Sequence, residues 1–332
     1  MRTAPVSHSA SCALSVIVPV YREEANIQSF LKRVVPVVEG LGPFEIIFCL
    51  DPSPDKTEQL IREEAERDPR IRALVFSRRF GQPAATLAGI LNAHGERVVV
   101  IDVDLQDPPE LIADLWRKAA EEDLEVVTAR RRTRAGETAI KRTIAGAGYS
   151  LINSIAEVGI PRDTGDFRLI SRRVVEELRL LKEGHGFLRG LVSFVGFKQG
   201  EVLYDRDIRH QGRSNYNRYI GSLKIGFNGI FGFSVVPLQI MMWTGFSIAL
   251  LSVLGVAIVF ALKLIYGHRY PVGVPTITIL VLFMGGVQLA AAGILGEYIG
   301  RIYEEVRERP QYIVDHAIGM KIVEPRGPRA PR

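Results

Sequence analysis

The sequence predicts an α/β fold with a mostly parallel sheet, followed by two helices that cross a membrane. Short β-branched runs alternate with helical segments over residues 14–101, an order typical of parallel sheets covered on both faces. No Asp, Glu, Lys or Arg occurs in residues 225–262 or 270–296. Because a spanning helix needs roughly 20 apolar residues, both stretches are too long for ordinary buried helices, and we expect spans at about 235–265 and 272–296.

Each element of the α/β part has its own local signal. Leu14–Val20 is short, apolar and β-branched, which indicates a buried strand. Pro108 and Pro109 end the fourth strand and favour a helix after it. The expected elements are, in chain order, a disordered stretch at 1–12, a strand at 14–20, a helix at 23–39, a strand at 44–50, a helix at 57–67, a strand at 71–76, a helix at 84–94, a strand at 97–101, a helix from about 110 and a strand at 125–129.

The flanks of the apolar stretches predict an inner-membrane protein with both termini and its catalytic part in the cytoplasm. The N-terminus lacks the pattern of a secretory signal, and Lys and Arg crowd the outer flank of each expected span, which the positive-inside rule assigns to the cytoplasm. Apolar residues at helical spacing in 215–233 indicate an amphipathic helix in the membrane interface, the alternative being a core helix. Residues 13–214 would form the catalytic domain, 234–300 the two spans and 301–332 a cytoplasmic tail.

Composition and missing motifs narrow the classes of function. The net charge of +5 suggests anionic partners, and with two spans we expect lipid head groups and phosphates rather than nucleic acid. Cys12 and Cys49 suit a reducing compartment and form no metal or disulfide pattern. No G-x-G-x-x-G follows the first strand and no G-x-x-x-x-G-K-[ST] occurs, which argues against dinucleotide-binding and P-loop proteins. A homo-oligomer is expected, of unspecified order.

The strongest chemical signal is the pair of acids after the fourth strand. Asp102 and Asp104 stand two residues apart just past Arg97–Ile101, where open α/β sheets hold ligands. Hard cations such as Mg²⁺ and Mn²⁺ prefer oxygen ligands, so such a pair suits a metal that binds a substrate diphosphate. The alternative is a capped loop with solvated acids.

Several segments, in their order, resemble the polyprenyl-phosphate glycosyltransferases of glycosyltransferase family 2, relatives of dolichol-phosphate mannose synthase. The similarity runs from about Leu14 to Val314 and implies a GT-A fold. The matching segments are Val18-Pro19-Val20-Tyr21-Arg22-Glu23-Glu24, Ser77-Arg78-Arg79-Phe80-Gly81-Gln82, Asp102 through Glu110, Gly165-Asp166-Phe167-Arg168-Leu169, Arg209-His210-Gln211-Gly212-Arg213-Ser214, and the stretch from Gly296 to Glu305.

The resemblance implies roles for individual residues. Asp166 and Asp104 would be catalytic, and the metal would be held by Asp102, Asp104 and Gln106. The nucleotide sugar would contact Pro19, Tyr21, Glu23, Asp51, Gln82 and Asp102. The acceptor phosphate would contact Arg130, Arg142, Arg168, Arg209, Arg213 and Ser214, with Arg131 as a further candidate. The usual Asp-Asp-Gly-Ser is replaced here by Leu50-Asp51-Pro52-Ser53, which leaves the nucleotide's identity open.

The function implied by the resemblance is inverting transfer of one sugar from a UDP- or GDP-sugar to a polyprenyl phosphate at the cytoplasmic membrane face, with Mg²⁺ or Mn²⁺. Because a phosphate monoester has a second pKa near 6, the acceptor needs little deprotonation, and we expect Asp166 mainly to position substrate. A processive polysaccharide synthase is an alternative, but its typical Gln-x-x-Arg-Trp motif does not occur. A non-catalytic nucleotide-sugar-binding membrane protein is the other.

Overall fold

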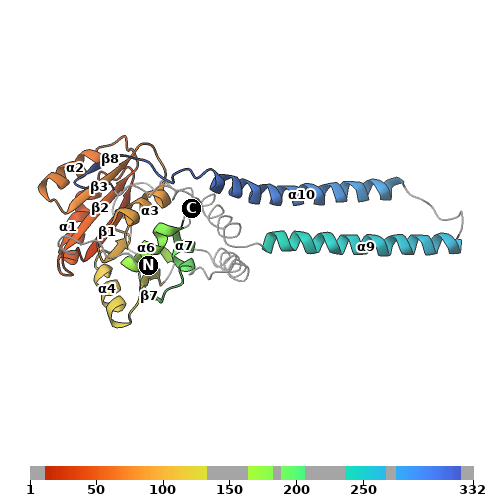
Figure 1. Ribbon diagram of the computed structural model, residues 1–332, viewed down its shortest axis with the longest axis horizontal. Helices are drawn as coiled ribbons and strands as arrows, with labels where there is room; N and C mark the ends of the chain where they lie inside the picture. Colours follow the sequence, from red (N-terminus) through yellow and green to blue (C-terminus); the bar gives the residue numbers. More distant parts are fainter. Residues whose placement is uncertain (1–11, 133–163, 182–187, 206–235, 267–273, 323–332) are drawn as a thin grey trace, which may run out of the picture.

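The computed structural model describes residues 12–132, 164–181, 188–205, 236–266 and 274–322. An eight-stranded sheet forms the centre of the catalytic part, with strand order β7-β5-β6-β4-β1-β2-β3-β8 (Figure 1). The strands are β1 (Leu14–Val20), β2 (Phe44–Leu50), β3 (Ile71–Phe76), β4 (Arg97–Val100), β5 (Val126–Arg131), β6 (Thr164–Ser171), β7 (Gln199–Tyr204) and β8 (Val314–Ile318).

Strands β1 to β4 form the parallel centre of this sheet. Strand β1 lies between β4 and β2, and β3 follows β2 with the same direction. Every residue of β2 is buried, as expected of a parallel strand covered on both faces. Two strands run the other way: β6 is antiparallel to both β4 and β5, and β8 is antiparallel to β3. The sheet is therefore mostly parallel, as the alternating pattern predicts.

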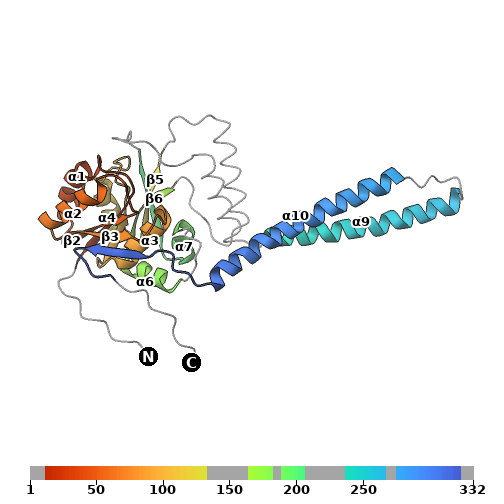
Figure 2. The ribbon, with the colours of Figure 1, turned by 90° about the horizontal axis from the view of Figure 1, so that it is seen from above.

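Helices cover both faces of the sheet (Figure 2). On one face, α1 (Ile27–Glu39), α2 (Thr57–Arg67) and α4 (Leu111–Glu121) pack on a core that includes Val16, Phe48 and Leu169. On the other face, α3 (Gln82–Asn92), α6 (Arg172–Leu180) and α7 (Leu188–Phe194) pack on a core that includes Ile17 and Ile170. The three layers hold the carboxyl ends of the parallel strands in fixed positions.

Gly89 allows helix α3 to pack close to the sheet. A Cβ atom at this position would lie 2.3 Å from Cγ2 of Ile17 and 2.6 Å from Sγ of Cys49. Such contacts are too short for any side chain, so glycine is required by the approach of the helix to β1 and β2 rather than by its backbone conformation.

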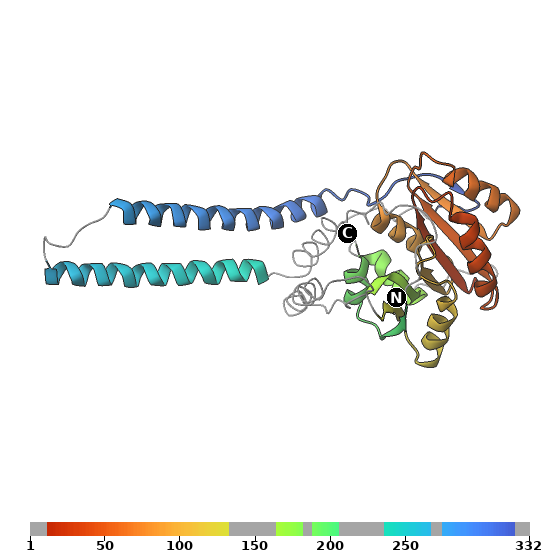
Figure 3. The same ribbon diagram turned by 180° about the vertical axis from the view of Figure 1, so that it is seen from behind.

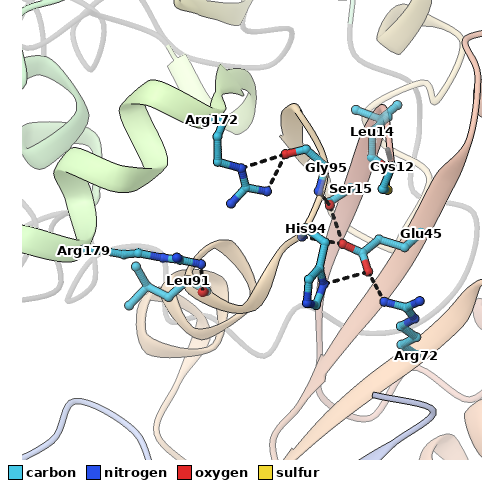
Figure 4. Close-up of polar contacts among 10 residues, drawn as sticks. All are labelled: Cys12, Leu14, Ser15, Glu45, Arg72, Leu91, His94, Gly95, Arg172 and Arg179. Carbon is cyan, nitrogen blue, oxygen red and sulfur yellow. Dashed lines mark hydrogen bonds and ion pairs between the residues drawn. The ribbon is translucent and has the colours of Figure 1, made fainter. Parts of the chain in front are cut away.

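A polar network closes the amino-terminal edge of the parallel strands (Figure 4). The carboxylate of Glu45 is buried in β2 and accepts hydrogen bonds from the Ser15 hydroxyl at 2.6 Å and from the His94 backbone at 2.7 Å. Its second oxygen accepts from Arg72 at 2.5 Å. Burial disfavours the charge, but the hydrogen bonds from His94 and Ser15 outweigh it and lower the pKa of Glu45. This edge is a structural cluster, opposite the edge where ligands bind in open α/β sheets.

The C-terminal part of the chain forms two long helices that project from the domain side by side (Figures 1 and 3). They are α9 (Val236–Tyr266) and α10 (Val274–Val306). Among the residues that the structure describes, no helix combines the length and the apolarity needed to cross a membrane. The two predicted spans are thus not confirmed, although the described parts of both charge-poor stretches are helical.

The expected elements up to β5 occur with small shifts at their ends. Helix α1 begins at Ile27 rather than at 23, and α3 covers 82–92 rather than 84–94. The segment 301–332, expected to be a tail, is partly structured: α10 continues to Val306, and β8 pairs with β3. The interfacial helix expected at 215–233 and the disordered stretch expected at the N-terminus fall outside the described residues, except for Cys12.

Candidate active site

The candidate site lies at the carboxyl ends of the parallel strands. Tyr21 follows β1, Asp51 follows β2 and Asp102 follows β4, so the sheet brings all three to one edge. Asp166 reaches the same edge from the opposite direction, because β6 runs antiparallel and Arg168 pairs with Val100 at the end of β4. Asp166 stands two residues before Arg168, and Asp102 stands two residues after Val100, so both lie at this end of the paired strands. The predicted catalytic and metal-binding acids therefore share one edge.

Asp51 organises the loop that follows β3. It is only 3% exposed, and its two carboxylate oxygens accept hydrogen bonds of 2.9 Å from the backbone N–H groups of Phe80 and Gly81. Gly81 has a φ of +90°, a conformation that glycine adopts without strain. The sequence predicts that Asp51 contacts the nucleotide, whereas in the structure both oxygens hold this turn. The acid that remains in Leu50-Asp51-Pro52-Ser53 thus has a clear structural task.

Gln82 connects this loop to the acids after β4. Its Nε2 donates a 2.9 Å hydrogen bond to Oδ1 of Asp102. Asp104 is 8% exposed, and its Oδ1 accepts from the backbone N–H of Gln106 at 3.2 Å. Between them, Leu105 has a φ of +59°, which is strained for a residue with a side chain and typical of functional loops. The loop thus holds Asp102 and Asp104 in a tight turn at the site.

The described residues include no group of three or more His, Cys, Asp and Glu side chains placed to share a metal ion. Asp102 and Asp104 together supply two carboxylates at this edge. Two carboxylates are the usual protein contribution to a magnesium site that also uses substrate phosphates and water.

A buried polar cluster supports the acidic loop from β5 and β7. The hydroxyl of Tyr204 donates to Oδ1 of Asp107, and Nε of Arg131 donates to the Tyr204 oxygen at 3.2 Å. Nη2 of Arg131 lies 3.8 Å from Oδ1 of Asp107. Burial and the neighbouring Asp107 carboxylate raise the pKa of Tyr204, which keeps this hydroxyl protonated. Arg131, a candidate phosphate ligand by sequence, here holds the loop in place.

Asp166 lies among arginines at the start of β6. Nε of Arg189 in α7 donates to its Oδ1 at 2.8 Å, and Nη2 of Arg168 lies 3.9 Å from the same oxygen. Burial opposes ionisation, but these two guanidinium groups and that of Arg131 lower the pKa of Asp166. A carboxylate in this setting stays ionised at neutral pH and is a weak base.

The loop after β1 combines aromatic and basic side chains. The guanidinium of Arg79 lies 4.1 Å from the centroid of the Tyr21 ring, and that of Arg22 lies 5.2 Å from it. Glu23 accepts a 2.6 Å hydrogen bond from Asn26, which precedes α1, and its backbone N–H donates to Thr57. Pro19 pairs with Cys49 in the neighbouring strand. These contacts hold Tyr21 and Glu23 at the edge of the site.

The predicted phosphate-binding residues that the structure describes make contacts within the protein. Arg130 pairs with Glu201 of β7 at 3.0 Å. Arg168 is 3% exposed and donates to the carbonyl of Gly165 at 3.0 Å. Four further candidates, Arg142, Arg209, Arg213 and Ser214, lie outside the described residues.

Sequence reasoning missed three residues that the structure brings to this edge. Asp107 follows Asp104 by three residues within the same acidic loop, and this closeness in sequence is a signal that could have found it. Tyr204 and Arg189 follow no motif, because their roles arise from contacts between strands and helices that are distant in the chain.

Comparisons with known proteins agree with this arrangement. The glycosyl transferase family 2 model matches residues 15–179. The SfII prophage-derived bactoprenol glucosyl transferase of Shigella flexneri is 41% identical over 307 residues, covering 91% of this chain and 97% of the relative. This chain belongs to glycosyl transferase family 2. The uncharacterized glycosyltransferase YkcC of Bacillus subtilis is also 41% identical, over 92% of this chain and 94% of its own length.

A more distant likeness exists among solved structures. The glucosyl-3-phosphoglycerate synthase of Mycobacterium tuberculosis, crystallised with Mn²⁺, UDP-glucose and phosphoglyceric acid, is 22% identical with a TM-score of 0.43, over 67% of this chain and 78% of that one. No ligand of this chain follows from so remote a relation. Membership of family 2 makes the chain a glycosyltransferase, and its α/β, mostly parallel sheet is the GT-A arrangement that the resemblance implies.

Proposed function

We propose that this glycosyltransferase moves one sugar from a nucleoside-diphosphate sugar to a polyprenyl phosphate, with inversion at the anomeric carbon. The observation that carries the proposal is the near full-length similarity to proteins named bactoprenol glucosyl transferases, at 40–41% identity. The acids at the carboxyl edge of the sheet, Asp102, Asp104 and Asp166, fit the reaction. A glucosyl donor is the first choice because of the relatives' names.

The proposed reaction needs little proton transfer. A phosphate oxygen of the acceptor forms a bond to the anomeric carbon, and the bond from that carbon to the donor's diphosphate breaks, with its electron pair leaving on the nucleoside diphosphate. Because the acceptor phosphate is largely a dianion at neutral pH, no strong base is required. This agrees with the lowered pKa of Asp166.

Asp102 and Asp104 fit a divalent cation, with Gln106 as a further oxygen donor. Their carboxylates stand at a strand end and are held in place by Gln82 and by a backbone N–H. Mg²⁺ is commonly held by one or two carboxylates together with substrate phosphates. When bound, such an ion stabilises the negative charge of the departing diphosphate.

The direction of β8 supports a lipid acceptor. Helix α10 ends at Val306, and β8 then starts at Val314, opposite Phe76 at the carboxyl end of β3. The catalytic edge therefore lies on the side of the domain where the chain arrives from α10 (Figure 1). Both long helices carry exposed apolar side chains, including Leu250, Leu264 and Leu289. We propose that α9 and α10 hold the enzyme at the cytoplasmic face of the inner membrane, where a lipid phosphate is reached.

The test is an assay of the full chain with radiolabelled nucleotide sugars, undecaprenyl phosphate and Mg²⁺ or Mn²⁺. We expect labelled lipid with at least one donor, and none after addition of EDTA or in the variant Asp102→Asn. Asp123→Asn, an exposed change at a turn that asparagine tolerates, is the control and keeps activity. A wild-type chain that labels no lipid with any UDP- or GDP-sugar would refute the proposal.

A further inference from the structure

We propose that Arg189 is a positioning residue for the transfer reaction: it fixes the Asp166 carboxylate by one oxygen and leaves the other oxygen for a substrate hydroxyl. The inference rests on the proposed function, and it adds a residue from outside every motif of the sequence. Its starting point is the 2.8 Å hydrogen bond from Nε of Arg189 to Oδ1 of Asp166.

The packing of helix α7 holds Arg189 in place. Arg189 belongs to α7, in which Leu188 and Leu191 are 5% and 3% exposed and pack in the core that includes Ile17 and Ile170. Helix α7 also packs on α6, which directly follows β6. The strand that carries Asp166 and the helix that carries Arg189 are therefore parts of one packed unit. A side chain held by such a unit can fix the direction of its partner.

Arg168 restricts the same oxygen from within β6. It is 3% exposed, its Nη2 donates to the carbonyl of Gly165, and the same atom lies 3.9 Å from Oδ1 of Asp166. Burial lowers the pKa of Arg168 to about 10, so this group is still charged at neutral pH. Arg131 lies near the same turn: a Cβ atom added at Gly165, the residue before Asp166, would lie 3.3 Å from its Nη2.

The two oxygens of Asp166 are therefore not equivalent. Oδ1 is engaged by Arg189 and faces Arg168, whereas Oδ2 makes no hydrogen bond within the described residues. About a quarter of the Asp166 side chain is exposed, so Oδ2 can be reached. An ionised oxygen accepts a hydrogen bond from a sugar hydroxyl strongly. Holding the sugar in this way would set the anomeric carbon relative to the incoming phosphate.

Arg189 also sets the charge state of its partner, together with Arg168 of β6 and Arg131 of β5. All three arginines favour the ionised form, against the opposing effect of burial. If Arg189 loses its charge, the pKa of Asp166 rises. The fraction of ionised Asp166 at mildly acidic pH then falls, and an activity that needs the carboxylate is lost at a higher pH than in the wild type.

The experiment compares Arg189→Gln, Arg189→Lys and the control Arg173→Gln in the full chain. Arg173 is an exposed arginine that follows the end of β6 opposite to Asp166, and its Nη1 lies 3.5 Å from Oε1 of Glu125. We measure kcat and donor KM from pH 5 to 8, and the titration of the Asp166 carboxyl carbon by ¹³C NMR, assigned through Asp166→Asn. In Arg189→Gln we expect kcat to fall about 100-fold, donor KM to change little, and both the acidic limb and the NMR titration to move to higher pH. Arg189→Lys keeps the charge, so its titration stays near that of the wild type.

The outcomes separate the two proposals. A wild-type chain that labels no lipid contradicts the proposed function, while the NMR titration still reports whether Arg189 controls Asp166. An active wild type with an unmoved titration in Arg189→Gln, or with kcat within threefold of the wild type, overturns the role of Arg189. Thermal unfolding of Arg189→Lys shows that its fold is intact, so a merely structural loss is recognised.

Discussion

Gln82 donates a hydrogen bond of 2.9 Å from its amide nitrogen to Oδ1 of Asp102. The loop that Asp51 holds after β3 is thereby joined to the acidic loop after β4. The ends of β2, β3 and β4 are thus connected through side chains at the edge where the donor is proposed to bind, although β1 lies between β4 and β2 in the sheet.

Replacing Gln82 by alanine should weaken donor binding. Without the Gln82 amide, the Asp102 carboxylate loses the hydrogen bond that orients it. A hydrogen bond to a charged group contributes about 1.5–3 kcal/mol when it is sheltered from water. Because Gln82 is exposed, we expect the lower end, roughly a tenfold rise in donor KM. Steady-state kinetics measures it. Gln59→Ala, which removes a similar bond to Glu63 on the outer face of α2, should leave KM unchanged, and an equal effect in both variants would contradict the prediction.

Asp51→Asn should destabilise the fold as well as the site. An asparagine side chain has one acceptor oxygen, so it satisfies only one of the backbone N–H groups of Phe80 and Gly81. A buried donor left without a partner costs about 1–3 kcal/mol. Urea unfolding measures the loss, with the exposed Asp123→Asn as control. If Asp51→Asn raises donor KM at unchanged stability, Asp51 acts through the nucleotide, as the sequence alone suggests, rather than through the loop.

Much of the fold could be predicted from sequence where the signal is local. The first three strands have the predicted bounds, because short β-branched runs between turns have few other solutions. The placement of Asp102 and Asp104 at a strand end follows from the same pattern.

The remaining features depend on tertiary contacts that no local pattern encodes. Arg189 becomes part of the site only because α7 packs on α6, which follows β6, so that its side chain reaches Asp166. The direction of β6, which returns Asp166 to the catalytic edge, is set by pairing with β4 and β5. The resemblance implies that Asp51 contacts the nucleotide, but sequence does not show that the backbone N–H groups of Phe80 and Gly81 lie within its reach.

The Glu45 network predicts a pH dependence of stability. The pKa of Glu45 is lowered in the folded protein, so this carboxylate binds a proton more readily in the unfolded chain. The stabilisation from Glu45 is then fully present above the unfolded pKa of about 4.3, and it is lost as the pH falls through the lower, folded value.

Glu45→Gln tests this dependence by urea unfolding between pH 3 and 7. At pH 7 we expect a loss of about 1–3 kcal/mol, because Arg72 and Ser15 lose a charged acceptor. The difference from the wild type should shrink towards pH 3. Glu122→Gln, which removes an exposed pair with Lys118, should change stability by less than about 1 kcal/mol. A difference that stays constant down to pH 3 would show that the Glu45 charge is not the cause.

Strand β8 offers the sharpest test of how the C-terminal segment supports the catalytic domain. It covers the edge of β3, and Tyr312 just before it packs against Phe76 with ring centroids 6.0 Å apart. The backbone N–H of Ser77, which opens the loop held by Asp51, donates to the carbonyl of Ile313. Removing residues 311–332 should therefore expose the edge of β3, which favours association between chains, and loosen the donor loop.

We expect the truncated chain to aggregate more readily and, in its monodisperse fraction, to show a higher donor KM. The matched control ends at residue 322, which keeps β8 and removes only the last ten residues. Size-exclusion chromatography and kinetics on both chains measure the two effects. The point variant Ala317→Pro gives a second route: Ala317 pairs with Leu74, and proline there removes a donor from the pairing strand. Full donor affinity and normal solubility in both the truncation and the proline variant would mean that the sheet edge needs no cover and that the donor loop is held by Asp51 alone.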